Sequence, residues 1–424
     1  MRKILFVLPF FPFPMTTGGH QALFNGIFAV KDKYDIYLVF KVTNIEEYQK
    51  VKQSFENRIP SAHLFPWFLK TMKPSKKRIF IWETKKIIKK LLGIKSPTPI
   101  STDPAQKLYS EWLNSILPLH REWLEHVGKV CQQIQFDIIQ VEMPWMISQI
   151  LTLPVQPKKI FVHHELGFVR RGLEVENLKQ NEYLKAYKKF VDINEITMLN
   201  MYDMVITLSS VDRAKLIEKG VSVPVSTSMA IVDTLPIPQY EGCDGKRLVF
   251  LGFSRHVPNF VGITWFLEQC WKVILRYDRS YSLDIIGKWD EKLQEEYRHK
   301  YPNINFLGFV DNLVETMRGA IMIVPITIGS GIRMKILEAC SAGVPFVSTS
   351  VGAEGIPVIN GEHCFIADDV NDFVEDIIKL QDVDLQRKFV KNANKLVQDK
   401  YSIDSLRKNR LNIYNELMDF NGLA

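Results

Sequence analysis

The stretch from Gly329 to Ile356 constrains the fold of this chain more than any other. It follows an apolar run at residues 320–324, which is typical of a buried strand. It then opens with Gly329 and Gly331, where a backbone can pass close to a ligand. Residues 332–341 are expected to form a helix. A strand, a glycine loop and a helix in this order indicate an α/β unit whose loop can meet an anion.

The start of this expected helix is the strongest candidate for a binding site. Free backbone N–H groups and the positive end of the helix dipole favour an anion there. Arg333 and Lys335 add positive charge where a helix ordinarily favours acids. Glu338 lies one turn further along about the same face, where a carboxylate can accept hydrogen bonds from paired hydroxyls such as those of a ribose. Phosphates beside a sugar diol indicate a nucleotide site.

Together with Phe250–Asn259 upstream and Asn360–Glu362 downstream, this stretch resembles the donor-binding segment of the retaining GT-B glycosyltransferases of family 4. The resemblance covers most of the C-terminal half. It implies the α/β GT-B fold, in which two Rossmann-like, doubly wound parallel-sheet domains face a central cleft. It also implies transfer of a hexosyl or deoxyhexosyl group from a nucleotide sugar with retention of configuration. Many members carry a glutamate where this chain has Ser330, so the contact to the transferred sugar differs here.

The chain is long enough for two or three domains, each with its own core. We expect an acceptor-binding domain at residues 1–235 and a nucleotide-sugar-binding domain at residues 246–400, joined by a linker containing proline and glycine. By the resemblance, a helix within residues 405–424 returns to the N-terminal domain. Residues 45–128 exceed what one crossover needs, so we expect a helical insert that meets the acceptor.

Candidate residues in the N-terminal half follow the ends of expected strands, because ligands of parallel sheets bind there. Gly18 and Gly19 join the first strand to a helix. His163 and His164 end a later strand, where the family commonly has a histidine that approaches the transferred sugar. The register makes His164 the first choice and His163 the second. Glu142 ends another strand and is interpreted as a polar strand terminus.

In the C-terminal half, the resemblance places Gly252 and the backbone after the strand at residues 304–307 beside the donor, and Arg255 beside its pyrophosphate. The candidate catalytic residues are His164, His163, Arg255 and Lys335. The candidate donor-binding residues are Gly18, Gly19, Gly252, Phe309, Val310, Gly329, Ser330, Gly331, Arg333 and Glu338. Because three cationic side chains and the helix amides would surround the pyrophosphate, we expect no metal and no cofactor, only a UDP-, GDP- or dTDP-linked sugar as substrate.

Composition and motifs argue against several other classes of protein. A Gly-x-Gly-x-x-Gly fingerprint is absent from the first strand-to-helix turn, which disfavours a dehydrogenase. The five cysteines are scattered without Cys-x-x-Cys spacing, as expected for buried thiols in a reducing cytoplasm. Residues 1–13 imitate a signal peptide, but prolines interrupt the apolar run, and we expect a first buried strand instead.

Basic residues concentrate at positions 70–95, with apolar residues at roughly helical spacing. This pattern predicts a basic amphipathic helix, which would either lie on anionic lipid at the inner face of a membrane or expose a solvated basic face. Both alternatives remain open. Nucleic acid is not an expected partner, because no nucleic-acid-binding motif accompanies the charge. The basic, aromatic insert favours a glycan or lipid-linked glycan precursor as acceptor, as in polysaccharide biosynthesis.

Two other functions fit parts of the same pattern. A non-catalytic glycosyltransferase-like subunit would keep the nucleotide loop and bind a partner protein, and the serine at position 330 gives this alternative some support. A nucleotide-sugar epimerase or a phosphorylase of similar two-domain shape is the other. Consumption of free phosphate or isomerisation of the donor would distinguish these two from a transferase.

Overall fold

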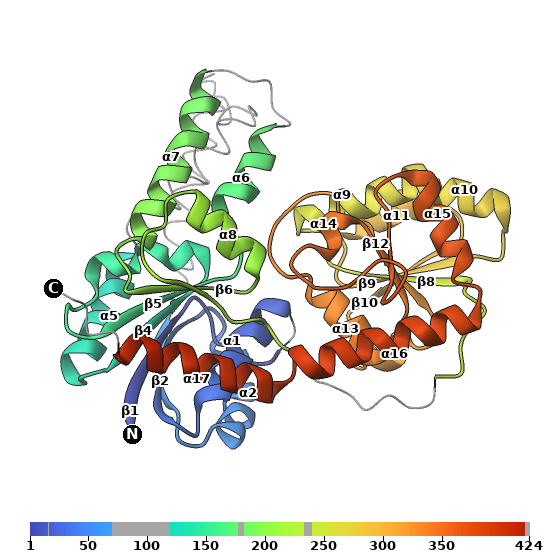
Figure 1. The fold of residues 1–424 in the computed structure, drawn as a ribbon. Coiled ribbons are helices and arrows are strands. Elements are labelled where there is room, and N and C mark those ends of the chain that lie inside the picture. Colours follow the sequence, from blue (N-terminus) through green and yellow to red (C-terminus); the bar gives the residue numbers. More distant parts are fainter. Residues whose placement is uncertain (16, 70–118, 177–181, 233–239, 420–424) are drawn as a thin grey trace, which may run out of the picture.

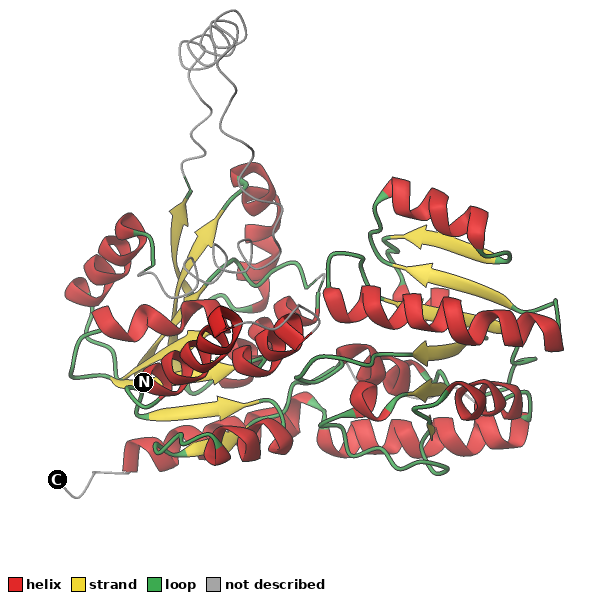
Figure 2. Ribbon diagram, turned by 90° about the horizontal axis from the view of Figure 1, so that it is seen from above, coloured by secondary structure: helices red, strands yellow, loops and turns green. Residues whose placement is uncertain are grey.

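The computed structural model describes residues 1–15, 17–69, 119–176, 182–232 and 240–419 as two α/β domains that lie side by side (Figure 1). Each domain is built around one sheet, and every strand pair in the two sheets is parallel. Helices lie on the faces of both sheets (Figure 2). Parallel sheets need this cover, because their strands are apolar on both sides. The expected pair of doubly wound domains is confirmed.

The N-terminal sheet has seven strands in the order β3-β2-β1-β4-β5-β6-β7. They are β1 (Arg2–Leu8), β2 (Tyr34–Val42), β3 (His63–Phe68), β4 (Ile138–Glu142), β5 (Lys158–His163), β6 (Met204–Thr207) and β7 (Val225–Thr227). The described connections are α1 (Gly18–Val30), α2 (Ile45–Arg58), α5 (Arg121–Gln133), the 3-10 helix η1 (Pro144–Thr152), α6 (Gly167–Glu176), α7 (Glu182–Leu199) and α8 (Ser210–Glu218). The central strand β1 is buried on both faces from Ile4 to Leu8, which explains why the proline-interrupted apolar start of the chain forms a strand.

The C-terminal sheet has six strands in the order β10-β9-β8-β11-β12-β13. They are β8 (Arg247–Leu251), β9 (Ser282–Ile286), β10 (Ile304–Gly308), β11 (Ile321–Val324), β12 (Phe346–Ser348) and β13 (Phe365–Ile366). The described helices are α9 (Val257–Trp265), the π-helix η2 (Phe266–Cys270), α10 (Trp271–Tyr277), α11 (Glu291–Lys300), α12 (Leu313–Met317), α13 (Met334–Ala342), α14 (Ser350–Ala353) and α15 (Val370–Lys379). The apolar run at residues 320–324 forms β11, as expected, and leads to the loop before α13.

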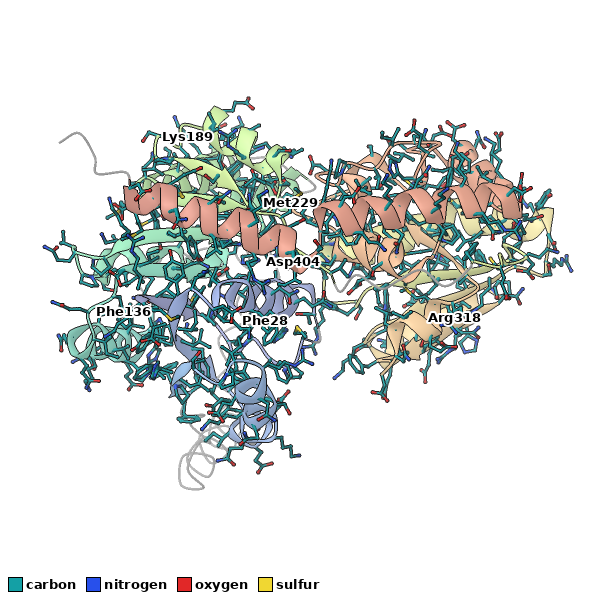
Figure 3. All side chains as sticks on the ribbon, turned by 60° about the horizontal axis from the view of Figure 1, so that its bottom comes forward. Phe28, Phe136, Lys189, Met229, Arg318 and Asp404 are labelled. Carbon is teal, nitrogen blue, oxygen red and sulfur yellow. The ribbon has the colours of Figure 1, made fainter. Side chains whose placement is uncertain are left out.

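The last two helices cross from one domain to the other. Helix α16 (Val383–Lys400) packs on the C-terminal domain, whereas α17 (Ile403–Asp419) packs beside α1 on the N-terminal domain. Leu406, Ile413 and Leu417 of α17 belong to the N-terminal core. Figure 3 shows the two helices nearly in line across both domains, with Asp404 close to the break between them.

Of the helical insert that we expected at residues 45–128, the structure describes residues 45–69 and 119–128. They contain α2 and the beginning of α5, but they also supply β3, the edge strand that pairs with β2. Residues of β3 are held to the sheet by aromatic packing: the His63 ring stacks on Tyr37 at 4.4 Å, and the Trp67 ring lies edge-on to Trp123 at 5.8 Å. The predicted basic helix at residues 70–95 lies outside the described residues. Within the described ranges, no helix combines the length and the apolar character that crossing a bilayer requires.

The packing of α9 onto the loop after β11 generates a prediction about stability. A Cβ added at Gly262 would lie 2.4 Å from the carbonyl oxygen of Pro325, so Gly262→Ala should lower the free energy of unfolding by about 1–3 kcal/mol. Gly128 in α5 is a matched control, because nothing lies within 4 Å of its added Cβ. Gly128→Ala should stabilise by about 0.5–1 kcal/mol. Urea denaturation measures both, and equal midpoints for the two variants would contradict this packing.

Candidate functional site

The loop before α13 turns around one of its own side chains. Helix α13 begins at Met334, two residues later than expected, with Arg333 at its N-cap position. The guanidinium NH1 of Arg333 donates to the carbonyl oxygens of Ser330 and, at 2.6 Å, of Gly331. Gly329 and Gly331 have φ values of 112° and 84°, which residues with a side chain rarely adopt. The glycines therefore allow the turn, and the arginine fills its centre.

The same loop contacts the N-terminal domain directly. A Cβ at Gly331 would lie 2.9 Å from the carbonyl oxygen of His164, so only a glycine lets the two backbones approach this closely. The hydroxyl of Ser330 accepts a hydrogen bond from the backbone N–H of Leu166 at 3.2 Å. A Cβ at Gly18 would lie 2.8 Å from the side chain of the first residue of α13. The structure thus brings candidate residues of both domains together around the start of α13.

Positive charge is buried at this corner. Arg333 is 8% exposed, and its Nε and NH2 atoms have no hydrogen-bond partner among the described residues. Burial lowers the pKa of Arg333, although Glu165 acts in the opposite direction. Burial, and secondarily Arg333, lower the pKa of Lys335 to about 7. The Lys335 ammonium donates to Oδ1 of Asn259 at 2.8 Å and lies 4.6 Å from the centre of the Phe250 ring.

A neutral histidine lies within the same group of cations. His256 precedes α9, and its pKa is lowered to about 4, first by burial and then by Lys335, Arg170 and Arg333. It therefore carries no charge at neutral pH. Arg170 forms an ion pair with Glu165 at 3.2 Å. A group of buried cations of this kind is suited to a multiply charged anion.

Glu338 lies deeper along α13 and contacts the opposite domain. Its Oε1 accepts a hydrogen bond from Nε2 of Gln21 in α1 at 3.1 Å. Burial raises the pKa of Glu338, whereas the Gln21 hydrogen bond and the charge of Lys335 oppose the increase. A carboxylate accepts several hydrogen bonds, so Glu338 can hold Gln21 and a sugar diol at the same time.

The two adjacent histidines have different surroundings. His163 is 1% exposed, and its Nε2 lies 2.7 Å from Oε1 of Glu195. Glu195 also accepts hydrogen bonds from the backbone N–H groups of Gly167 and Phe168. The His163–Glu195 pair therefore anchors the start of α6. His164 has a side chain that is 9% exposed, and its Nε2 lies 2.7 Å from Oε2 of Glu142. His164 is therefore the more accessible of the two.

Other candidate residues lie along the carboxyl edge of the C-terminal sheet. Arg255 is exposed after β8, and Phe309 is 67% exposed after β10, beside the half-buried Val310. The carbonyl of Gly252 already accepts from the indole N–H of Trp289 at 2.8 Å. No hydrogen bond or ion pair between described residues joins Arg255, Phe309 or Val310 to the loop before α13.

The remaining candidate, Gly19, packs inside the N-terminal domain. A Cβ added there would lie 3.3 Å from Cε of Met143. As for metals, no group of three histidine, cysteine or carboxylate side chains suited to an ion occurs within the described ranges.

Three site residues were missed or undervalued in the sequence. Asn259 stands at the end of the motif that carries the resemblance, but only the packing of α9 shows that it holds Lys335. Glu142 appeared to be a polar strand end, and the structure instead pairs it with His164. Gln21 gave no signal apart from its position just after Gly18 and Gly19.

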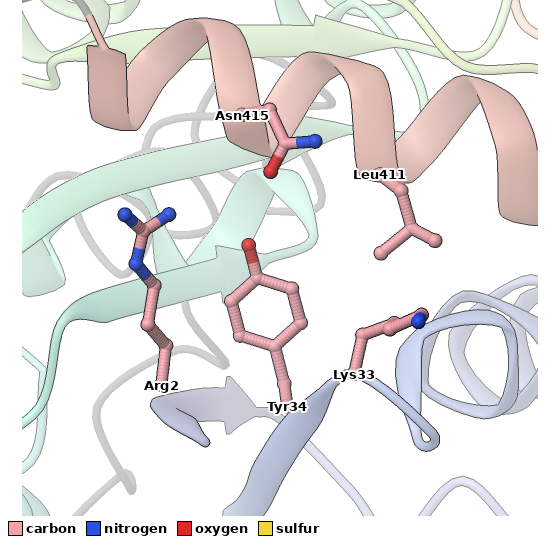
Figure 4. Close-up of a pocket in the computed structure, with 5 residues that line it drawn as sticks. All are labelled: Arg2, Lys33, Tyr34, Leu411 and Asn415. Atoms are coloured by element: carbon pink, nitrogen blue, oxygen red, sulfur yellow. The ribbon is translucent and has the colours of Figure 1, made fainter.

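A pocket of about 330 Å³ opens in a different part of the molecule (Figure 4). It is lined by Arg2, Lys33, Tyr34, Leu411 and Asn415. Arg2 and Tyr34 begin β1 and β2, so the pocket lies at the amino edge of the N-terminal sheet. The candidate residues of this domain follow the opposite, carboxyl edge. The pocket is therefore not part of the candidate site.

Comparison with known proteins finds a family match within the C-terminal domain. Residues 245–382 match the family model described as Glycosyl transferases group 1, and this range contains α13 and the loop before it but not the N-terminal residues that meet them. Over 303 residues the chain is 22% identical to an uncharacterized 44.6 kDa protein in the cps region of Klebsiella pneumoniae, covering 67% of this chain and 76% of that protein. Over 195 residues it is 28% identical to an uncharacterized glycosyltransferase of Methanocaldococcus jannaschii. That match covers 42% of this chain and only 47% of the relative.

Among solved structures, a mutant of S. aureus TarM in complex with UDP, fondaparinux and α-GlcNAc-glycerol superimposes with a TM-score of 0.68. The match covers 97% of this chain and 100% of TarM at 13% sequence identity. The chain has the GT-B fold. The family match to the C-terminal domain and this structural likeness together support a GT-B glycosyltransferase.

The approach of Gly331 to His164 can be tested by substitution. Gly331→Ala should push the two domains apart, because its Cβ would lie 2.9 Å from the His164 carbonyl oxygen. Gly343→Ala is the matched control: Gly343 also has a positive φ, of 70°, but its nearest contact is a valine methyl at 3.4 Å. We expect a larger drop in the thermal unfolding midpoint for Gly331→Ala than for Gly343→Ala. Equal drops for both variants would refute the interdomain contact.

Proposed function

We propose that the chain is a retaining glycosyltransferase that moves a hexosyl or deoxyhexosyl group from a nucleoside-diphosphate sugar to a hydroxyl of a glycan or lipid-linked glycan precursor. One observation carries the proposal. Two guanidinium nitrogens of Arg333, which have no hydrogen-bond partner in the described part of the chain, and the buried ammonium of Lys335 lie at the amino end of α13, where this domain meets His164 of the other. Such a position suits a diphosphate whose sugar is directed into the cleft.

The proposed donor site distributes the parts of a nucleotide sugar along α13. The backbone N–H groups at the start of the helix, Arg333 and Lys335 would hold the pyrophosphate. Glu338, oriented by Gln21, would accept hydrogen bonds from the ribose hydroxyls. Phe309 and Val310 would border the base, and Arg255 would reach the phosphates from its exposed position. No metal is required in this scheme, because protein cations neutralise the leaving group.

Sugar transfer would proceed by attack of an acceptor hydroxyl on the anomeric carbon. As the new bond to the acceptor oxygen forms, the bond to the phosphate oxygen breaks, and the acceptor proton passes to the departing phosphate. Negative charge grows on the diphosphate during this step, so fixed cations there lower the barrier. His164, held by Glu142, would contact the transferred sugar from the N-terminal side.

Donor and acceptor classes are inferred from several features together. The TarM structure contains UDP, which favours a uridine nucleotide among UDP, GDP and dTDP. The same structure contains α-GlcNAc-glycerol and fondaparinux, which favours a glycan acceptor. A cytoplasmic enzyme that touches the inner face of a membrane through residues 70–95 fits a lipid-linked precursor. This contact is part of the proposal, and the segment lies outside the described residues.

A non-catalytic glycosyltransferase-like subunit is the second candidate. The observation in its favour is that position 330 holds a serine whose hydroxyl is occupied by the N–H of Leu166. Thermal unfolding with UDP-, GDP- and dTDP-sugars identifies the nucleotide, because a ligand at about 100 times its dissociation constant stabilises by about 2.7 kcal/mol. Slow hydrolysis of the stabilising nucleotide sugar would support an enzyme. Stabilisation without turnover, with or without acceptor glycans, would contradict the proposal and support the subunit.

Substitution of Lys335 tests the charge-stabilising role. Lys335→Ala should lower kcat/KM by at least about 100-fold, because a charged contact to the leaving group is lost in a buried site. Lys292→Ala, at an exposed position of α11, is the matched control and should leave the rate unchanged. Initial rates with the stabilising donor measure both. A loss for Lys335→Ala of less than about tenfold, or about 1.4 kcal/mol, would contradict the role.

Donor binding should also take up a proton. With a pKa of about 7, Lys335 is mostly neutral at pH 8, and a bound diphosphate raises this pKa and favours the charged form. Calorimetry at pH 8 in buffers of different ionisation enthalpy should therefore show net proton uptake on binding of the nucleotide sugar. The uptake should shrink below pH 6, where the lysine is already protonated. Equal proton uptake by Lys335→Met and the parent would exclude this lysine as its source.

A further inference from the structure

A buried series of polar side chains connects His164 to helix α17. Oε2 of Glu142 lies 2.7 Å from Nε2 of His164. Oε1 of the same carboxylate accepts from the amide nitrogen of Gln140, and the Gln140 carbonyl accepts from the hydroxyl of Tyr414. We call these four residues the His164–Tyr414 relay. It begins near the loop of the candidate donor site and ends in the helix that crosses between the domains.

The relay has one consistent direction. The NH2 group of Gln140 donates to the Glu142 carboxylate, and the Gln140 carbonyl accepts from Tyr414. Burial raises the pKa of Tyr414, which keeps its hydroxyl protonated and able to donate. The remaining carboxylate oxygen then accepts from His164, so the imidazole carries its proton on Nε2. Nδ1 is the nitrogen left to accept a hydrogen bond from a substrate.

The position of these residues makes the relay costly to break. Gln140 and Tyr414 are fully buried, and Glu142 is 2% exposed. A buried carboxylate is tolerated only where its oxygens have partners. Gln140 and Glu142 alternate with one residue between them on β4, so both side chains point to the same face of the sheet. Tyr414, which lies 274 residues after Gln140 in the sequence, provides the last hydrogen bond of the network.

We propose that Glu142, Gln140 and Tyr414 are positioning residues that fix the ring orientation and the Nε2–H tautomer of His164, so that α17 supports the histidine of the transfer site. The effect on sugar transfer rests on the proposed function, whereas the tautomer of His164 does not. The neighbouring His163 has a different role, because its partner Glu195 caps α6 and does not belong to the relay.

The tautomer can be read from the ring nitrogen shifts of ¹⁵N-histidine-labelled full-length protein, with His164 assigned by its loss in His164→Gln. The parent should show protonated Nε2. As long as Tyr414 keeps donating to Gln140, the new side chain in Glu142→Gln accepts from Gln140 with its carbonyl, so its NH2 group donates to Nε2 of His164. The proton should therefore move to Nδ1. A purely structural role of Glu142 does not predict this exchange.

Tyr414→Phe tests the far end without changing the shape of the core. It should keep the proton on Nε2, because Glu142 still accepts from His164, but it should shift the ring signals of His164 and lower kcat at least about tenfold, with the KM for the donor within about twofold. Tyr34→Phe is the matched control: the Tyr34 ring is 3% exposed and packs edge-on against Tyr414 at 5.4 Å, but its hydroxyl belongs to the pocket in Figure 4 rather than to the relay. It should leave the ring signals of His164 and kcat unchanged.

Distinct results overturn each part of this inference. Protonated Nδ1 in the parent, or Tyr414→Phe spectra identical to those of the parent, would refute the relay. An exchanged tautomer in Glu142→Gln with undiminished kcat would refute its link to catalysis. If the parent transfers sugar from no donor, the proposed function fails, and the nitrogen shifts still decide whether the relay sets the tautomer.

Discussion

The backbone of Gly331 lies against the carbonyl group of His164, and the candidate site depends on this contact between the domains. No residue with a Cβ fits there, so the loop before α13 has to be a glycine loop for the domains to meet. Around it, Ser330 accepts from Leu166, and Lys215 of α8 forms an ion pair with Glu354 at 2.6 Å. These contacts place the amino end of α13 at the boundary of the two domains.

Burial of cations at this boundary explains the electrostatics of the site. Removing an ammonium or a guanidinium from water disfavours its charged form, and neighbouring cations disfavour it further. Lys335 therefore has a pKa of about 7, and His256 one of about 4. Groups with pKa values shifted in this way are concentrated at functional sites. A bound ligand of opposite charge stabilises the charged form of the side chain, which burial disfavours. Glu165, Glu354 and Asp212 oppose the lowering of the pKa of Arg333, and Glu338 opposes that of Lys335.

Local sequence patterns were enough to predict much of the fold. Apolar runs bounded by glycine predicted β11 and the loop after it, and the motifs of the C-terminal half correctly indicated the GT-B fold. Three features could not be predicted, because they arise from contacts between distant segments. Arg333 folds back onto its own loop and delays α13, β3 is recruited as an edge strand by β2, and Glu142 becomes the partner of His164. Nothing in the local sequence indicates that Tyr414 and Gln140 would meet.

The crossing helix also has a consequence for biosynthesis. Leu406, Ile413, Tyr414 and Leu417 of α17 complete the core of the first domain, although the entire second domain is translated before them. The part of the N-terminal core that α17 covers therefore stays exposed until α17 has been made, although α1 and α2 already pack on the same cluster. An exposed face of this kind is a target for chaperones and a risk for aggregation. The N-terminal domain is translated first, but its core is completed last.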